Sequence, residues 1–554
     1  MFLPPVNARE NKNLQFTYFG GLDLRAKADA NTLLSCHNLS ANSYPAISPR
    51  ASRNLIYSGK NITKICAPEY NADGLSSFTG VENNQFFYQG KKIGDLTDGE
   101  KSIADFNGRI CIFPDKLYYS YLPDSETGEI SQNLVSMENT LSLSGVKFYS
   151  SYDTLTGSYS AYINKSGAGF DSFKTGDSIV ISGCSQENNN VCILSGTGDY
   201  ADSNSIISAV VESATADRLN LLLFKKNGEY ATFTNCTEPA EISIKISIPD
   251  MDHICVHNNR LWGTDKNGEY IYASKLGDCT NFNSFQGLSD DSWYGRIGTA
   301  GEFTGICSYR SAVVAFKREC IHHIYGDSPQ SFSIPKQTLG GCIDGKSIAE
   351  IGGILHYLSP TGFCCYGGGE PYSINDRLGN LNFVSCCAGT DSKRYYASVC
   401  DRSGDYSLLV YEPNFGIWHK EDNLPFISFL QYAGRLYGAT PDRLYLFGSG
   451  QEDIDWSFTT QRITFSSMLH KGLNNIWLRL DIKENAHIDV EISYDGGSFS
   501  LCRSIDGSLG FGTKRVPVRL KKCDSFQLRV SGRGNATIHD LEMIYYQGGK
   551  NFGI

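Results

Sequence analysis

The chain has 554 residues, of which 41% are hydrophobic and 19% charged, so it is long enough to bury a large core in about two to four domains. Its formal net charge of −10 argues against a body that grips nucleic acid through a basic face. No run of about 18 apolar residues occurs, so no membrane-spanning helix is expected.

The composition favours strands over helices. Glycine (56 residues), tyrosine (32) and phenylalanine (30) are abundant, and aromatic runs between glycine-rich turns are typical of strands. No long segment has the period of an amphipathic helix, so we expect an all-β protein.

The opening residues lack a charged segment followed by an apolar one, so no secretory signal is expected. The 18 cysteines are then expected to stay reduced in a cytosol.

Residues 1–124 are expected to hold an N-terminal segment and the first blades of a repeated fold. They contain the motif NLSANSYPAISPR, Asn38–Arg50. The guanidinium of Arg50 can brace the first strand or bind a carboxylate of a neighbouring subunit, and we favour bracing. The candidate structural or inter-subunit residues of this motif are Tyr44, Pro45, Ser48, Pro49 and Arg50.

A repeat runs along much of the chain. Each copy has a polar or glycine turn, a short alternating strand, a tight turn and a tyrosine-rich strand. Six copies are Phe106–Leu122, His257–Leu276, Tyr309–Gly326, Ile351–Gly368, Asp391–Glu412 and Tyr432–Gly448, and a seventh is expected at Phe78–Ile93. The last four begin at 309, 351, 391 and 432, which are 42, 40 and 41 residues apart. That spacing fits one four-stranded blade, so we expect a β-propeller of about six or seven blades. The alternative is a string of β-sandwiches.

Residues 125–250 interrupt the repeat. Their alternating segments Phe170–Cys184 and Arg218–Phe233 are typical of a small inserted β-barrel or sandwich. The remaining blades are expected over 251–454, where Asn267-Gly268 predicts a hairpin turn and not a metal site.

Residues 455–554 are expected to form a C-terminal β-sandwich, since alternating strands recur there at short intervals. This part carries 13 Lys+Arg and 10 Asp+Glu, so its net charge is +3 within an acidic chain. Its SYDGGSFS segment, 493–500, is similar to the Asp box of propeller glycosidases. We expect a plain turn there, with Asp495 accepting hydrogen bonds from the backbone of Gly496 and Gly497.

Two further patterns suggest chemistry. Gly340–Ser347 matches the phosphate-cradling G-x-x-x-x-G-K-S pattern, but a helix should follow it and the next segment is typical of a strand, so we expect a loop. The vicinal pairs Cys364-Cys365 and Cys386-Cys387 lack zinc-ligand spacing. Because neighbours on a strand point to opposite faces, each pair is expected to divide between core and surface. The sequence assigns no catalytic, cofactor-binding or metal-binding residue.

Several stretches, in order, resemble a group of phage and prophage virion proteins. They are NLSANSYPAISPR; PDMDHICVHNNRLWG followed by IYASKLGDCTNFNSF; VVAFKRECIHHIYGDSPQSF; GCIDGKSIAEIGGILHYLSPTGFCCYGGGEPYSI; and VPVRLKKCDSFQLRVSGRG. The resemblance covers most of the chain and weakens over 125–250. The high cysteine count departs from the group's pattern.

The resemblance implies a non-enzymatic structural protein of a tailed phage, made in the host cytoplasm and placed in the virion tail. It looks most like a propeller-bearing nozzle or hub, a homo-oligomeric ring such as a hexamer. Expected partners are tube, adaptor or fibre proteins, the host surface, and phage DNA that passes through without sequence recognition. No cofactor is implied. Two alternatives stay open: a propeller enzyme or receptor-binding protein acting on host surface polysaccharide, and a head–tail connector or adaptor.

Overall fold

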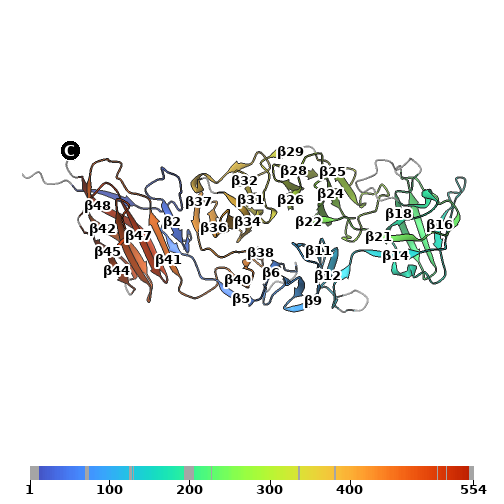
Figure 1. Ribbon diagram of the computed structural model, residues 1–554, viewed down its shortest axis with the longest axis horizontal. Coiled ribbons are helices and arrows are strands. Elements are labelled where there is room, and N and C mark those ends of the chain that lie inside the picture. Colours follow the sequence, from blue (N-terminus) through green and yellow to red (C-terminus); the bar gives the residue numbers. More distant parts are fainter. Residues whose placement is uncertain are drawn as a thin grey trace, which may run out of the picture. The chain divides into compact units, whose positions relative to one another are not determined.

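A computed structural model of the chain is shown in Figure 1. It describes residues 11–68, 74–123, 128, 130–191, 205–225, 228–334, 337–379, 382–507, 510–519 and 521–547. These residues form 48 strands and four 3-10 helices of three residues each, which confirms the all-β prediction. The 3-10 helices are η1 (Phe170–Ser172), η2 (Glu187–Asn189), η3 (Gly345–Ser347) and η4 (Asp376–Leu378).

The chain divides into two compact units. Unit 1 comprises residues 1–65, 76–78 and 346–554, and unit 2 comprises residues 66–75 and 79–345. Each unit is built from antiparallel sheets whose strands mostly follow one another in chain order. Such meanders need only short turns, which the glycine-rich sequence supplies.

Unit 1 contains three four-stranded sheets. The first is β30 (Ala349–Ile351), β31 (Ile354–Ser359), β32 (Gly362–Tyr366) and β33 (Tyr372–Ser373). The second is β34 (Phe383–Thr390), β35 (Tyr395–Asp401), β36 (Tyr406–Glu412) and β37 (Ile417–Lys420). The third is β38 (Ser428–Tyr432), β39 (Arg435–Ala439), β40 (Arg443–Leu446) and β5 (Asn54–Ser58). Strand β6 (Ile62–Ile65) lies against β38 and β39.

Unit 2 repeats the same pattern. One four-stranded sheet is β10 (Ser102–Phe106), β11 (Arg109–Phe113), β12 (Leu117–Ser120) and β13 (Val135–Ser136). Another is β22 (Met251–His257), β23 (Arg260–Asp265), β24 (Tyr270–Ala273) and β25 (Trp293–Arg296). A further one is β26 (Phe303–Tyr309), β27 (Ala312–Lys317), β28 (Cys320–Tyr325) and β29 (Gln337–Leu339). Strands β7 (Gly80–Glu82), β8 (Gln85–Tyr88) and β9 (Lys91–Asp95) also pair in chain order.

Each of the six full repeats in the sequence supplies the second and third strands of one four-stranded sheet. The turn before the second strand is tight and left-handed: Asn258 and Asn259 have φ of 47° and 54°, and Ala433 and Gly434 have φ of 49° and 69°. Positive φ at both central residues is the signature of a type I′ hairpin turn, which asparagine and glycine tolerate best. The polar or glycine turns predicted from the sequence are therefore confirmed.

The vicinal cysteines correct one expectation. Cys364, Cys365, Cys386 and Cys387 are all buried, with exposures of 6%, 1%, 1% and 8%. Neighbouring side chains still point to opposite faces, but β34, which carries Cys386 and Cys387, contacts both β30 and β38. Both faces of a strand can be buried where neighbouring sheets cover it, so the expected division of each pair between core and surface was wrong.

The inserted segment forms its own sheet within unit 2. Eight strands pair in the order β14 (Asn139–Leu143), β21 (Ile242–Ile246), β17 (Ser178–Ser182), β18 (Ser208–Ala214), β19 (Arg218–Phe224), β16 (Tyr159–Asn164), β15 (Val146–Tyr152) and β20 (Cys236–Glu238). One hydrophobic cluster joins strands from both halves of this sheet, including Ile181 and Phe148. In chain order, the first strand of the segment is β14 and the last is β21, and these two strands pair side by side. The chain therefore enters and leaves the inserted segment at one place.

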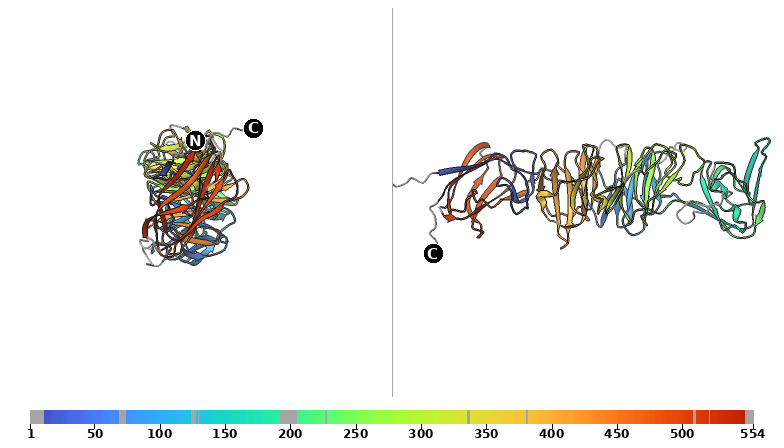
Figure 2. Two further views of the ribbon diagram at one scale, coloured as in Figure 1. Left: turned by 90° about the vertical axis from the view of Figure 1, so that its left-hand side faces the viewer. Right: turned by 90° about the horizontal axis from the view of Figure 1, so that it is seen from above.

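The C-terminal strands form two five-stranded sheets. One holds β1 (Asn11–Phe16), β48 (Ala536–Gln547), β42 (Lys471–Ile482), β45 (Gly510–Pro517) and β46 (Lys522–Cys523). The other holds β2 (Leu33–His37), β41 (Asp455–Thr460), β47 (Phe526–Arg533), β43 (His487–Tyr494) and β44 (Ser500–Asp506). Figure 2 shows β1, in blue, lying along the red C-terminal strands. Within the predicted range of residues 1–124, the N-terminal segment contributes β1 and β2 to the C-terminal sheets.

Candidate functional site: a buried arginine network

The motif Asn38–Arg50 folds as a small closed loop in unit 1. Strands β3 (Leu39–Ser40) and β4 (Ser48–Pro49) pair antiparallel at its base. The Ser43 hydroxyl donates to the Ser48 hydroxyl at 3.0 Å across the loop. The Tyr44-Pro45 peptide is cis, and the Tyr44 ring stacks on Phe415 with ring centroids 4.2 Å apart.

This loop lies between the C-terminal sheets and the sheet of β34–β37. Ile47 and Ile538 of β48 exchange backbone hydrogen bonds of 3.0 and 2.9 Å, and the Pro45 carbonyl accepts from the Phe19 backbone N–H. On the other side β3 lies against β37, and the Asn38 backbone N–H donates to the Glu421 carbonyl at 2.6 Å. The loop is therefore tied to two sheets that are far apart in sequence.

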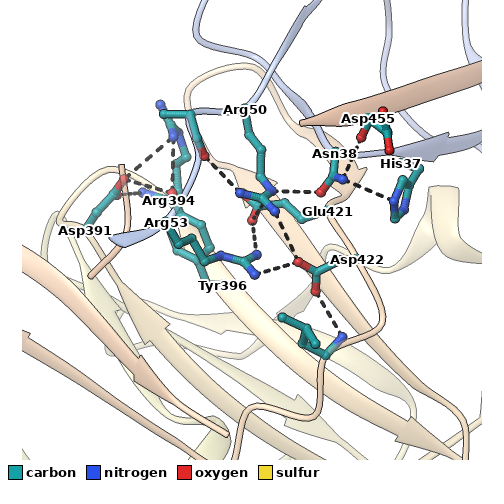
Figure 3. A network of polar contacts seen from close by, with 12 residues as sticks. His37, Asn38, Arg50, Arg53, Asp391, Arg394, Tyr396, Glu421, Asp422 and Asp455 are labelled. Carbon is teal, nitrogen blue, oxygen red and sulfur yellow. Dashed lines mark hydrogen bonds and ion pairs between the residues drawn. The ribbon is translucent and has the colours of Figure 1, made fainter. Parts of the chain in front are cut away.

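Arg50 points inward from the end of the motif (Figure 3). Its Nε donates to the Asn38 side-chain oxygen at 2.9 Å, and its guanidinium lies 3.4 Å from the carboxylates of both Glu421 and Asp422. Asn38 has φ of 55° and donates its amide to the Asp455 carbonyl at 2.7 Å. Burial is the main influence on Arg50 and lowers its pKa, opposed by Glu421.

Arg53, three residues further on, makes the shorter contacts. It donates to Glu421 and to Asp422, each at 2.6 Å. Its guanidinium also lies over the rings of Phe447 and Phe426, 4.5 and 4.9 Å from their centroids. Burial acts to lower the pKa of Arg53, but the two carboxylates outweigh it and the pKa is raised. The Arg53 side chain is only 4% exposed, so this is a desolvated ion pair held by charge-assisted hydrogen bonds.

A third arginine extends the network along β35 and β36. Arg394 donates to Glu412 at 2.9 Å, donates to the Tyr396 hydroxyl at 3.2 Å, and contacts the side chain of Asn42 in the motif loop. The Tyr396 hydroxyl donates in turn to Asp391 at 3.2 Å. Burial raises the pKa of Tyr396, and burial also raises that of Glu412. The hydroxyl therefore stays protonated as a donor.

The centre of the network balances two arginines, Arg50 and Arg53, against two carboxylates, Glu421 and Asp422, all four with side chains at most 12% exposed. Opposite charges that satisfy each other in a buried site hold segments together. Among these described residues, each charged group contacts an opposite charge of the same chain. The arrangement is suited to bracing.

Sequence reasoning singled out Arg50 but missed Arg53, Glu421 and Asp422. A signal existed: Arg53 repeats the charge of Arg50 three residues on, and Glu421-Asp422 is an acidic pair that lies between the repeats Asp391–Glu412 and Tyr432–Gly448. Nothing in the sequence places these two segments together, because about 370 residues separate them.

No family model matches the chain. No curated protein matches it either. Solved structures do. An exo-β-1,3-galactanase from Phanerochaete chrysosporium is 11% identical over 52% of this chain and 95% of its own, with a TM-score of 0.20. A Trypanosoma rangeli sialidase is 9% identical over 91% and 97%, with a TM-score of 0.20. The protein U3-55K is 8% identical over 56% and 98%, with a TM-score of 0.24. Scores this low carry no argument about this chain.

The phosphate-loop pattern Gly340–Ser347 is a loop, as predicted. It runs from β29 to the three-residue helix η3, and strand β30 follows. The glycines serve close packing: a Cβ on Gly341 would lie 2.0 Å from the Lys317 carbonyl oxygen. The Ser347 hydroxyl accepts from the Leu358 backbone N–H at 3.0 Å. The sequence matches the pattern, but the long helix that the phosphate chemistry requires does not follow.

The Asp-box-like turn corrects a second expectation. Asp495 does not bond to Gly496 and Gly497; its carboxylate accepts from the backbone N–H groups of Asp524 and Ser525 at 2.7 and 2.9 Å. The turn between β43 and β44 is therefore tied to the segment before β47. Only tertiary structure could supply these donors.

The hairpin at Asn267-Gly268 is confirmed. It joins β23 to β24, and the buried Asp265 accepts from the backbone N–H groups of Glu269 and Tyr270 at 2.8 and 2.9 Å. Over the described residues, no group of three or more His, Cys, Asp or Glu side chains is placed to hold a metal ion. In the same part of the chain, no helix is long and apolar enough to cross a membrane.

Proposed function

We propose that this chain is a structural subunit of a tailed-phage virion, a ring-forming nozzle or hub of the tail. The ordered motifs that resemble phage virion proteins support this proposal. Its partners would be identical subunits and the tube, adaptor or fibre proteins of the tail. Phage DNA would pass by an acidic surface that repels its phosphates, without sequence recognition.

The four-stranded sheets are, in this proposal, blades of a β-propeller of about six or seven blades. Within unit 2, first strands β10, β22 and β26 lie next to one another, and within unit 1, β30, β34 and β38 do the same. Packing of consecutive sheets through their first strands is how blades surround an axis. Strand β5, from near the N-terminus, completes the sheet of β38–β40, which joins the two ends of the repeat region as a propeller requires.

The observation that carries the proposal is the set of contacts that the motif Asn38–Arg50 makes within its own chain. Its charged residue Arg50 contacts Asn38, Glu421 and Asp422 of the same chain, and its backbone bonds to Ile538. A motif used to lock the C-terminal sheets to the β34–β37 sheet suits a subunit that must stay rigid within an assembly. In this proposal the chain carries out no chemical step.

The test is electron microscopy of the purified full-length protein, together with antibody labelling of virions that contain it. We expect closed rings of identical subunits and label at the tail tip. Label at the head–tail junction would move the protein to a connector role. A protein that stays monomeric at micromolar concentration and is absent from virions would refute the proposal.

A further inference from the structure

Unit 2 contains a pocket of about 720 Å³ where the inserted segment joins the four-stranded sheets. Its walls come from the residue just before β12, from the residue just before β14, from the connection between β21 and β22, and from β24 and β25, which are labelled in Figure 1. Pockets of about 300–1,000 Å³ are the usual size of small-molecule sites. None of the motifs singled out for chemistry in the sequence lies here except the hairpin after Asp265.

One wall is aromatic. Tyr270 and Tyr272 are two apart on β24, so their side chains share a face, and their ring centroids lie 6.1 Å apart. Tyr294 of β25 pairs directly opposite Tyr272, and Phe285 meets the Tyr294 ring edge to face at 5.8 Å. Tyr272, Tyr294 and Phe285 are half-buried. The strand pairing thus builds an array of rings that reaches the pocket surface.

Other residues that line the pocket are polar and carry both signs of charge. Lys116 lies 2.8 Å from Glu138 and 2.7 Å from Asp250, so one ammonium joins the two carboxylates. Burial acts to lower the pKa of Lys116, but the two carboxylates outweigh it and the pKa is raised. The lysine therefore stays charged and can donate hydrogen bonds to a ligand.

The charge of the lining selects the class of ligand. Three lysines line the pocket against four carboxylates, for a net charge of 3 − 4 = −1. This balance gives no attraction for a polyanion such as DNA or a nucleotide. A sugar has apolar C–H faces that pack on aromatic rings and hydroxyl groups that both donate to carboxylates and accept from ammonium groups. A pocket lined by tyrosine rings and by paired charges matches both properties.

We propose that this pocket binds a neutral saccharide, one or two sugar units long, without cleaving it. The ring faces of Tyr272 and Tyr294 stack on the sugar, and Glu138, Asp250 and the half-exposed Glu269 receive its hydroxyl groups. This inference does not depend on the virion role, since it rests only on the pocket.

The test is saturation-transfer NMR and calorimetry on the full-length protein with three neutral probes: maltotriose, cellotriose and N,N′,N″-triacetylchitotriose. We expect at least one to bind at millimolar concentration, with saturation passing from aromatic protons. Tyr294→Ala is expected to raise its Kd about tenfold, and Tyr294→Phe, which keeps the ring, is expected to raise it by less than about threefold. Glu269→Gln, at a half-exposed position, tests the contribution of the polar lining residues without disturbing the core.

The matched control is Tyr149→Ala, because Tyr149 is 39% exposed and lies on β15, away from the pocket. It should leave Kd unchanged. Failure of all three probes to bind would overturn the proposal, and so would binding that Tyr294→Ala leaves intact. Salt-sensitive binding of a single-stranded oligonucleotide, lost in Tyr294→Ala, would also overturn it, because the pocket would then recognise an anion. Ring formation by the same samples, measured separately, distinguishes these outcomes from failure of the proposed function.

Discussion

Replacement of Arg53 by methionine is the sharpest test of the arginine network. Methionine keeps most of the aliphatic volume but removes the guanidinium that contacts Glu421 and Asp422, each at 2.6 Å. The two carboxylates are then left with Arg50, whose contacts with them are longer, at 3.4 Å.

The size of the expected loss in the free energy of unfolding follows from the burial of these side chains. Arg53 is 4% exposed and its two carboxylate partners are 6% and 11% exposed. Removing one partner of a buried ion pair leaves an uncompensated charge and costs about 3–5 kcal/mol. The matched control is Arg479→Met: Arg479 contacts Asp540 at 2.9 Å, but its side chain is 49% exposed. A pair exposed to this extent contributes less than about 1 kcal/mol.

The assay is urea unfolding followed by tryptophan fluorescence, because Trp418 lies in β37 and Trp456 in β41, on the two sheets that the network joins. Hydrogen exchange should show faster opening of β3, β4 and β37 in Arg53→Met and unchanged exchange in Arg479→Met. In the double variant Arg53→Met/Glu421→Gln, the free energy of unfolding should fall by less than the sum of the falls in the two single variants, because the opposite charges are removed together. Equal losses of unfolding free energy in Arg53→Met and Arg479→Met would show that burial of the Arg53 ion pair does not set its contribution to stability.

Three further predictions concern other buried groups. Burial, aided by Arg394, lowers the pKa of His419 to about 4; because the unfolded chain takes up this proton near pH 6.5, stability should fall by about 3 kcal/mol as pH drops from 6.5 to 4. Urea midpoints measured across that range should lose part of this slope in His419→Gln, and an unchanged slope would contradict the assignment. Gly268→Ala should cost about 3 kcal/mol, because its φ is +75° and the new Cβ would lie 2.2 Å from the Gly301 carbonyl oxygen. Gly404→Ala, with φ of +86° and nothing within 4 Å, should cost only about 1 kcal/mol in the same thermal-unfolding assay, and equal costs would discount the clash. Burial raises the pKa of Cys365 to about 12, so peptide mass spectrometry should find it unlabelled by iodoacetamide at pH 8 until denaturant is added, whereas rapid labelling of the native protein would refute its burial.

Local structure was predictable where a pattern repeats over short range. The hairpin at Asn267-Gly268 depends on residues that are adjacent in the chain, so its turn chemistry is readable from the sequence. The same holds for the loop at Gly340–Ser347, whose flanking segments lack any helical period. The expectation for Asp495 was wrong because its donors, Asp524 and Ser525, come from a different turn.

The candidate site was predictable only in part. The motif drew attention to Arg50, but the preference for bracing over an inter-subunit contact could not be derived from the motif itself. The deciding groups, Glu421 and Asp422, lie about 370 residues away. A bond over such a separation depends on how sheets pack, and packing is not recorded in local propensity.

The all-β class, the hairpins that recur about every 41 residues and the tight turns between their strands were all readable from the sequence. Those features depend on backbone preferences and alternation within a few residues. Three outcomes came from the packing of the folded chain: β1 and β2 complete the C-terminal sheets, both faces of β34 are buried from Cys386 onward, and Arg50 and Arg53 contact Glu421 and Asp422. These outcomes depend on which apolar faces cover one another, and that is a property of the whole folded chain.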